Sequence, residues 1–234
     1  MKIALLGYGR MGKAIELLAI ERGHDIIAKI DQDLTDGNLS DADVAINFSI
    51  PEAAVENIKT ALKINIPVVC GTTGWLDQLK EVEDFCKAKN SAFIYASNFS
   101  VGVNLFFKLN KVLAKLMSSH KSYQPKMKEV HHIHKLDAPS GTAITLADGI
   151  IDQSDYSYWT IEKEVNGNLL PIKVERTGEV PGTHAIQYES PIDSITIEHQ
   201  AHSRQGFALG AVIAAEWIQD KKGVFSMNDV LSLE

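Results

Sequence analysis

The sequence predicts an α/β protein in which a doubly wound, mostly parallel sheet is joined to an α+β region with a mixed sheet. Two observations carry this prediction. Over residues 1–99, short apolar runs alternate with stretches whose apolar residues recur at helical spacing, as in strands joined by crossover helices. After residue 104 the chain changes to one long helical stretch, followed by strand formers that are separated by turn residues.

The first half begins with a predicted βαβ unit. Residues 2–6 and 25–31 resemble strands, and residues 11–21 between them have a helical repeat that stops at Gly23. Two strands joined by a helix within roughly 30 residues should be parallel. The alternation continues, with strands and helices expected in turn over 44–48, 51–62, 67–70, 76–89 and 92–96.

The second half should be an α+β region. Helices are expected over 105–117 and 143–151, with a strand over 127–132 between them. Residues 161–199 are rich in strand formers and contain turn pairs such as Thr177-Gly178, which indicate a mixed or antiparallel sheet. A last apolar helix, expected near residues 206–217, should return and pack on the first domain.

Composition limits the class of partner. The net charge of -7 argues against nucleic acid, because phosphate binding depends on clustered Lys and Arg. Only two cysteines occur, which favours a reduced compartment. The first residues lack a signal-peptide core, and no apolar run approaches the length of about 20 residues that a membrane-spanning helix needs. We therefore expect a cytoplasmic protein that binds neither nucleic acid nor membrane.

A glycine-rich turn follows the first predicted strand. Gly7 permits a tight turn, Gly9 lets the backbone approach a pyrophosphate, and Gly12 allows the next helix to pack closely. The G-x-G-x-x-G pattern alone is weak evidence, but Asp31 at the end of the second strand completes a dinucleotide-binding fingerprint. The expected ligands here are Gly7, Tyr8, Gly9, Arg10, Met11, Gly12 and Asp31.

Asp31 also bears on which dinucleotide is used. Its carboxylate would accept hydrogen bonds from ribose hydroxyls and repel a phosphate ester at the same place. Gln32 follows it, where an arginine would be expected for a phosphorylated ribose. NADH is therefore favoured over NADPH. The structural alternative is that Asp31 only caps the junction between strand and turn.

Two further segments should lie where ligands bind in open α/β sheets, at the carboxyl ends of strands. Threonine and asparagine side chains suit the amide and ribose of a nicotinamide, although each segment could equally be an ordinary polar turn. The expected ligands are Gly71, Thr72, Thr73, Ser97, Asn98, Phe99 and Ser100.

Three imidazoles and an ammonium group crowd into residues 131–135, a density that packed cores rarely tolerate. If this segment is extended, His132 and His134 share one face. Metal ligation would need His199 or His202 as well, and no cysteine or HExxH helix near these residues supports it, so no metal is expected. A purely structural histidine network is the other alternative.

The neighbouring cation favours catalysis. Lys135 should lower the pKa of a nearby imidazole and make it a better proton donor when it is charged. Ser140 is a candidate helix cap, and the N–H groups of Gly141 and Thr142 behind it would form a small anion site suited to a carboxylate. Together these groups predict a pocket for a carboxylated substrate.

Five segments resemble the 4-hydroxy-tetrahydrodipicolinate reductase (dihydrodipicolinate reductase) family, in the expected order over nearly the whole chain. They are GYGRMG, GTTG, SNFSVGVN, HHIHKLDAPSGTA and HSRQGFALGAV. The fourth segment is highly specific, unlike the glycine-rich turn. By this resemblance, His131 and Lys135 are proton donors, and the expected substrate ligands are His132, Ser140, Gly141 and Thr142.

The resemblance implies a Rossmann dinucleotide-binding domain over 1–99 and 207–234, and a substrate-binding and tetramerisation domain over 100–206. It implies hydride transfer from NAD(P)H to a cyclic imine dicarboxylate in lysine and diaminopimelate biosynthesis, by a homotetramer. Two alternatives remain, another NAD(P)-dependent amino-acid dehydrogenase and a non-catalytic NADH-sensing module.

Overall fold

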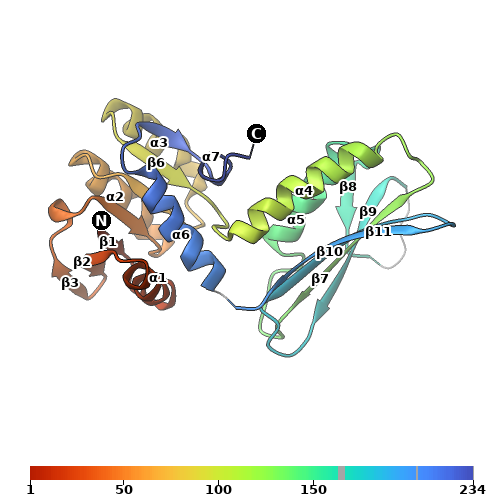
Figure 1. Cartoon of the computed structure of the whole chain (residues 1–234), viewed down its shortest axis with the longest axis horizontal. Helices are drawn as coiled ribbons and strands as arrows, with labels where there is room; N and C mark the ends of the chain where they lie inside the picture. The colour runs from red at the N-terminus through yellow and green to blue at the C-terminus, as the bar shows by residue number, and fades with distance from the viewer. Residues whose placement is uncertain (163–166, 204, 234) are drawn as a thin grey trace. The chain divides into compact units, whose positions relative to one another are not determined.

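The computed structural model describes residues 1–162, 167–203 and 205–233. The chain divides into two compact units (Figure 1). Unit 1 contains Met1–Val101 together with Gln205–Glu234, and unit 2 contains Gly102–Arg204.

Unit 1 is built on a seven-stranded sheet in the order β12-β6-β5-β4-β1-β2-β3. Neighbouring strands are parallel except β2 and β3, which form an antiparallel hairpin. The strands are β1 (Lys2–Leu6), β2 (Asp25–Asp31), β3 (Leu34–Gly37), β4 (Val44–Asn47), β5 (Val68–Cys70), β6 (Ala92–Tyr95) and β12 (Gly223–Phe225).

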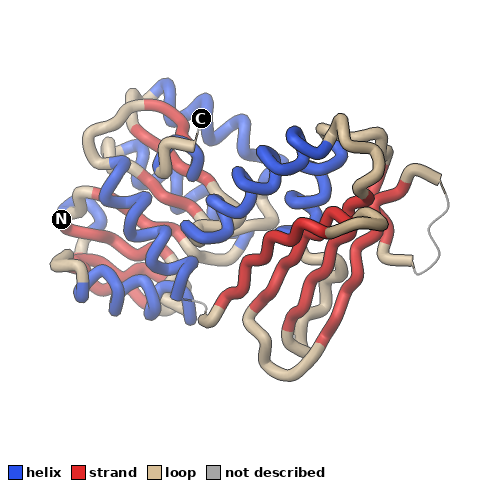
Figure 2. Tube along the Cα trace, turned by 45° about the vertical axis from the view of Figure 1, so that its right-hand side comes forward, coloured by secondary structure: helices blue, strands red, loops and turns tan. Residues whose placement is uncertain are grey.

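Helices cover both faces of this sheet (Figure 2), which confirms the predicted doubly wound class. Because side chains alternate along a strand, Ile3 and Leu5 of β1 pack with α1 (Arg10–Glu21), α6 (Gln205–Ile218) and α7 (Met227–Val230). Ala4 and Leu6 face the opposite layer, formed by α2 (Pro51–Lys63) and α3 (Leu79–Ala88). Two short 3₁₀ turns, η1 (Leu39–Asp41) and η2 (Leu76–Gln78), complete the connections.

Four short elements of unit 1 were not predicted from the sequence, namely β3, η1, β12 and α7. β3 has a polar sequence, LTDG, and forms because its backbone pairs with β2. Gly37 ends β3 opposite Ala28 at φ +81°, where an added Cβ would lie 1.9 Å from the Ile27 carbonyl oxygen. β12 and α7 have three and four residues, which is too short for a hydrophobic repeat to be read.

Unit 2 has a five-stranded sheet in the order β11-β10-β7-β9-β8. β7 pairs in parallel with β9 and antiparallel with β10, so the predicted mixed sheet is confirmed. The strands are β7 (Gln124–His131), β8 (Tyr158–Thr160), β9 (Leu169–Arg176), β10 (Gly182–Glu189) and β11 (Ser194–Ala201).

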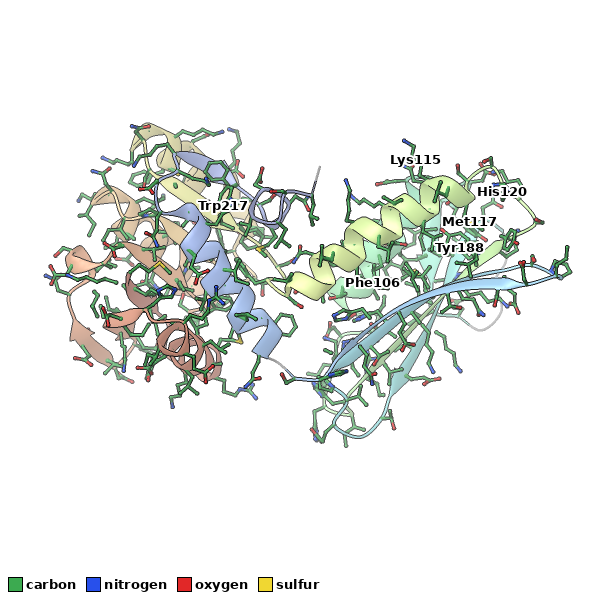
Figure 3. The ribbon with its side chains drawn as sticks, viewed as in Figure 1. Phe106, Lys115, Met117, His120, Tyr188 and Trp217 are labelled. Carbon is green, nitrogen blue, oxygen red and sulfur yellow. The ribbon has the colours of Figure 1, made fainter. Side chains whose placement is uncertain are left out.

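Two helices, α4 (Val101–Met117) and α5 (Gly141–Ile151), cover one face of this second sheet. Phe106 and Met117 of α4 and Tyr188 of β10 belong to the apolar layer between them (Figure 3). α4 begins at Val101, four residues before the predicted start at 105, because Val103 and Asn104 are already buried on its inner face. None of the helices in the described part of the chain has the length and apolarity needed to cross a bilayer.

Candidate active site

In unit 1 the glycine-rich turn joins β1 to α1. Gly7 has φ +96°, and a Cβ there would lie 2.4 Å from the Phe48 carbonyl oxygen. A Cβ on Gly12 would lie 2.4 Å from the Gly7 oxygen, so both positions require glycine for backbone packing. Gly9 is different, because nothing lies within 4 Å of an added Cβ and the residue is exposed at the start of α1. Its missing side chain leaves the amino terminus of the helix accessible.

The first turn of α1 is suited to an anion. No side chain caps its start, and none of its first residues is acidic. Arg10 is exposed and Met11 is half-buried in this turn. Backbone N–H groups at a helix start, together with the positive end of the helix dipole, are the usual phosphate-binding arrangement.

Asp31 reaches from the end of β2 to the same turn. Its Oδ2 accepts a hydrogen bond from the Tyr8 backbone N–H at 2.6 Å, and its Oδ1 accepts one from the Gln32 N–H at 2.8 Å. The carboxylate is exposed. The contact to Gln32 is what a residue that only caps the junction between strand and turn would make. The contact to Tyr8 also places the carboxylate beside the glycine-rich turn.

The other two expected segments follow β5 and β6, at the same edge of the parallel sheet. Thr72 is buried and its hydroxyl donates to the Ser49 carbonyl at 3.3 Å, whereas Thr73 is exposed. The Asn98 side chain accepts the Ser100 N–H at 2.9 Å. The Phe99 side chain lies in the core against Phe48, so a ligand could meet Phe99 only through its backbone.

The remaining expected residues of these segments are accessible. Gly71 is half-buried, and a Cβ there would lie 2.2 Å from the Phe48 ring. Ser97 is exposed and Ser100 is half-buried. Asn98 is half-buried as well, so the accessible polar side chains at this edge come from Thr73, Ser97, Asn98 and Ser100.

In unit 2 the histidine-rich segment lies at the end of β7. Glu129 and His131 alternate with solvent-facing residues and point to the helix-covered face, where they are 0% and 7% exposed. Register brings two further residues to them, since His184 of β10 pairs with Glu129 and Arg176 of β9 pairs with His131. The rings of His131 and His184 are 5.1 Å apart.

Glu129 is the centre of this cluster. Its Oε1 accepts a hydrogen bond from Arg176 Nη2 at 2.8 Å, and its Oε2 accepts the Ser140 N–H at 3.0 Å. The same Oε2 lies 3.6 Å from His131 Nδ1 and 3.8 Å from His184 Nε2. Burial opposes ionisation of Glu129, but the hydrogen bonds from Ser140 and Arg176 outweigh it and hold the pKa of the carboxyl group below its usual value.

Both buried imidazoles favour the neutral form. Burial lowers the pKa of His131, Glu129 partly opposes this, and Lys135 and Arg176 lower it further. Lys135 lowers the pKa of His131 as expected, but burial lowers it more. Burial also lowers the pKa of His184 to about 4.

The chain turns after His131, so the segment is not an extended strand through His134. The condition under which His132 and His134 would share one face of a strand is therefore not met. The Ile133 N–H donates to the Gly178 carbonyl at 3.1 Å, and the Lys135 N–H donates to the His132 carbonyl at 3.2 Å. His132 is half-buried. His134 is 70% exposed and lies 3.4 Å from Glu179.

The same loop holds Lys135 and the start of α5. Lys135 pairs with Asp137 at 2.8 Å, and Arg176 Nη2 donates to the Asp137 carbonyl at 2.7 Å. Ser140 is the predicted cap, since its Oγ accepts the Ala143 N–H at 3.2 Å. Ser140 is itself buried and its Oγ lies 3.1 Å from His184 Nε2. Exposed Gly141 and half-buried Thr142 follow it at the helix start.

Sequence reasoning missed Glu129, Arg176 and His184 as site residues. For Glu129 a signal was present in the sequence, because this charged residue shares the inward face of β7 with buried Met127 and His131. Arg176 and His184 come from strands 47 and 55 positions further along the chain, and only sheet register identifies them.

Glu129, His131 and His184 could also hold a metal, because one ligand atom of each lies within 4.8 Å of the others. Within the described ranges no such group contains His132, His134, His199 or His202. Arg176 donates to the same Glu129 carboxylate at 2.8 Å, and its positive charge opposes a divalent cation there.

A separate cavity of about 250 Å³ lies at the other end of the unit 2 sheet. Met117, His120 and Tyr188 line it (Figure 3), and none of the expected site residues does. Its place between the end of α4 and the first residues of β7 keeps it apart from the histidine cluster, which lies where β7 ends.

Comparison with known proteins decides the family. The profile described as "Dihydrodipicolinate reductase, N-terminus" matches residues 1–99, and the corresponding C-terminus profile matches residues 102–231. The chain belongs to the dihydrodipicolinate reductase family. The resemblance drawn from the five sequence segments is thereby confirmed.

Individual relatives agree. The 4-hydroxy-tetrahydrodipicolinate reductase of Christiangramia forsetii is 54% identical over 99% of this chain and 98% of its own length. That of Methanocaldococcus jannaschii is 37% identical over 82% of this chain and 72% of its own length. A dipicolinate-bound dihydrodipicolinate reductase from Paenisporosarcina sp. TG-14 has the same fold, with a TM-score of 0.80, 21% identity and 97% coverage of both chains.

Membership of this family makes the chain an NAD(P)H-dependent oxidoreductase of lysine biosynthesis. Residues 1–99 correspond to the NAD(P)-binding Rossmann domain. The predicted class of reaction and of cofactor is therefore confirmed.

Proposed function

We propose that this chain reduces 4-hydroxy-tetrahydrodipicolinate, a cyclic imine dicarboxylate after loss of water, to tetrahydrodipicolinate. One observation supports this assignment above the others. A buried imidazole, His131, lies in the same cluster as Lys135 and the start of α5, so a proton donor, a cation and helix N–H groups are available together. A dicarboxylate that gains negative charge during reduction needs these three functions.

In this proposal His131 donates the proton that follows reduction. Its pKa is lowered in the free protein, and the two carboxylates of a bound substrate would raise it again, because nearby negative charge favours the protonated imidazole. The acid is thus charged when substrate is present. Lys135 is the second proton donor and would exchange its partner Asp137 for a substrate carboxylate.

The expected substrate ligands have different parts in this proposal. His132, Gly141 and Thr142 would contact the substrate directly, the last two through N–H groups at the start of α5. Ser140 is buried and caps this helix, so its contribution is to hold the N–H groups in place.

The residues present in unit 1 fit a dinucleotide. The accessible backbone at Gly9 and the uncapped first turn of α1 would hold the pyrophosphate, and Asp31 would hold the ribose hydroxyls. Thr73, Ser97 and Asn98 would contact the nicotinamide and its ribose. When bound, the dinucleotide supplies the hydride.

We propose NADH as the preferred dinucleotide. Residues 32–43, which follow Asp31, contain four aspartates and no lysine or arginine. A phosphate on the ribose would meet this negative charge without a cation to pair with it. The β2–β3 hairpin holds part of this segment directly beside Asp31.

We further propose that residues 1–99 and 207–234 act as the dinucleotide domain and residues 100–206 as the substrate and tetramerisation domain. The sheet face of unit 2 that is turned away from α4 and α5 has ion pairs suited to a polar subunit contact, Lys126 with Glu189 and Lys128 with Glu175. Light scattering after size-exclusion chromatography tests the tetramer. Two free, buried cysteines favour a cytoplasmic location.

The test is steady-state kinetics with enzymatically generated substrate, followed by NADH absorbance and repeated with NADPH. Turnover with aspartate or homoserine but not with this substrate would assign a different amino-acid dehydrogenase. NADH binding without any turnover would assign a sensing module.

A further inference from the structure

Glu129 is unusual because it is an ionised side chain with no exposure to solvent. It lies in the middle of the buried row of β7, between Met127 and His131, and is 0% exposed. Such groups are rarely found fully buried unless they are paired. The pairing partners therefore indicate what the residue does.

Its two oxygens connect four separate parts of unit 2. Oε1 accepts from Arg176 at the end of β9, and Arg176 also donates to the Asp137 carbonyl in the loop after His131. Oε2 accepts from the N–H of Ser140, the residue that caps α5. One carboxylate thus links β7, β9, the loop that contains Lys135, and the start of the helix that offers Gly141 and Thr142.

The contact with His131 is electrostatic. At 3.6 Å the separation between Glu129 Oε2 and His131 Nδ1 is longer than a hydrogen bond, and this Nδ1 has no hydrogen-bond partner among the described residues. On the other side of the ring, a Cβ added to Gly182 would lie 3.0 Å from His131 Nε2. The ring is therefore held with Nδ1 toward the carboxylate and Nε2 toward the glycine.

The charges that face His131 come from several elements and have opposite effects. Glu129 on β7 and Asp137 in the loop raise the pKa of His131, while Lys135 in the loop and Arg176 on β9 lower it. His184 on β10 is neutral near pH 7, because its pKa is about 4. Removing Glu129 and removing Arg176 should therefore change the titration of His131 in opposite directions.

We propose that Glu129, together with Arg176, is a positioning unit that sets the protonation of His131 and fixes the Lys135 loop and the start of α5 relative to it. The proposal rests on the function assigned above to His131 and Lys135. It adds two residues that act through His131, Lys135 and the start of α5, since they determine where the proton donors stand and when one of them is charged.

The test uses Glu129→Gln and Arg176→Gln, with Glu179→Gln as the matched control. Glu179 is also a carboxylate paired with a histidine, His134, but is 79% exposed and lies outside the cluster. Two readouts are needed, the pH profile of kcat/KM for substrate and the titration of His131 followed by NMR. KM for NADH reports whether unit 1 is unaffected.

Glu129→Gln should lower the pKa of His131, so that activity declines at a lower pH than in the wild type. It should also reduce kcat by up to about 100-fold, because misplaced reacting groups lose rate steeply, with KM for NADH unchanged. Arg176→Gln should shift the decline to higher pH. Glu179→Gln should leave the His131 titration and the pH profile as they are.

Equal titration of His131 in the wild type and in folded Glu129→Gln would overturn the proposal, as would shifts of the same sign in both variants. If Arg176→Gln does not fold, Arg176→Lys replaces it. Lysine keeps the positive charge but lacks the planar guanidinium group that donates to both Glu129 and the Asp137 carbonyl. We therefore expect kcat to fall while the titration of His131 stays close to wild type. An unchanged kcat would then also count against the proposal. The proposed function fails separately, if the wild-type chain does not turn over this substrate. A fully active His131→Ala variant would contradict only the role given to His131.

Discussion

The glycine-rich edge of unit 1 and the end of β7 in unit 2 differ in which groups they offer to a ligand, backbone in the first and side chains in the second. The first consists largely of backbone on exposed turns, and its glycines provide tight packing at Gly7 and Gly12 and access at Gly9. The second consists of titratable side chains that three strands bring together in a buried cluster around Glu129. A backbone site tolerates changes of side chain that a buried charged site does not. The two regions should therefore respond differently to substitution, pH and ligand.

The largest expected effect is on chemistry in unit 2. His131→Ala should reduce turnover by about 100- to 10,000-fold, the usual contribution of a general acid, with little change in NADH affinity. Steady-state kinetics and NADH fluorescence titration measure the two quantities. His134→Ala is the control, because its side chain is 70% exposed in the same turn, and it should stay close to wild type. A parallel loss of NADH affinity in His131→Ala would contradict the assignment.

The next effect separates two glycines of unit 1. Gly7→Ala should destabilise the fold by roughly 3 kcal/mol or more, since its Cβ would lie 2.4 Å from the Phe48 oxygen at φ +96°. Gly9→Ala meets nothing within 4 Å and should keep its unfolding midpoint while NADH binds more weakly. Urea unfolding and NADH titration of both variants test this. Equal stability of the two variants would show that the turn at Gly7 accommodates a side chain.

Acid should destabilise unit 2 through His184. Burial holds the pKa of His184 at about 4 in the folded protein, against 6.5 for an exposed imidazole. The unfolded chain therefore binds more protons between these values, and the free energy of unfolding falls as the pH drops through them, by about 3 kcal/mol in total. Urea unfolding at several pH values should show this slope reduced in His184→Gln. The slope should be retained in His134→Gln, and identical slopes in both would argue against a neutral, buried His184.

The smallest effect concerns dinucleotide choice. Asp31→Ala should weaken NADH binding by about tenfold, since a hydrogen bond to a charged group contributes about 1.5 kcal/mol, and should weaken NADPH binding less. Titration of both dinucleotides into Asp31→Ala measures the difference. Asp36→Asn is the control for NADH only, because Asp36 is one of the four aspartates proposed to repel the NADPH phosphate. An unchanged dissociation constant for NADH would leave Asp31 with only its structural contacts to Tyr8 and Gln32.

Sequence reasoning was strongest where local pattern determines structure. The alternation of apolar runs and helical repeats gave the parallel sheet of unit 1, and the spacing of Ser140 before an apolar stretch gave the cap of α5. It failed where tertiary contacts decide. β3 has no hydrophobic pattern and exists through pairing with β2, and the turn after His131 depends on a contact between Ile133 and Gly178.

The site shows the same limit. The residues of 131–142 could be found because they are contiguous, whereas Arg176 and His184 are distant in sequence and enter only through the register of β9 and β10. The role of Glu129 could not be judged from its neighbours in the chain either. Burial on an inward row distinguishes it from an ordinary surface carboxylate, and that burial depends on the helices packed above it.

The order in which the chain leaves the ribosome matters for unit 1. One layer of its core is supplied by Ala208, Ala211, Val212 and Ala215 of α6, and Gly210 meets the Phe99 carbonyl so closely that a Cβ would lie 1.7 Å from it. Until those late residues are synthesised, the early strands expose an apolar surface to water. Unit 2 is continuous and can complete its folding first, so nascent chains that stall before residue 205 should be the ones that need chaperones.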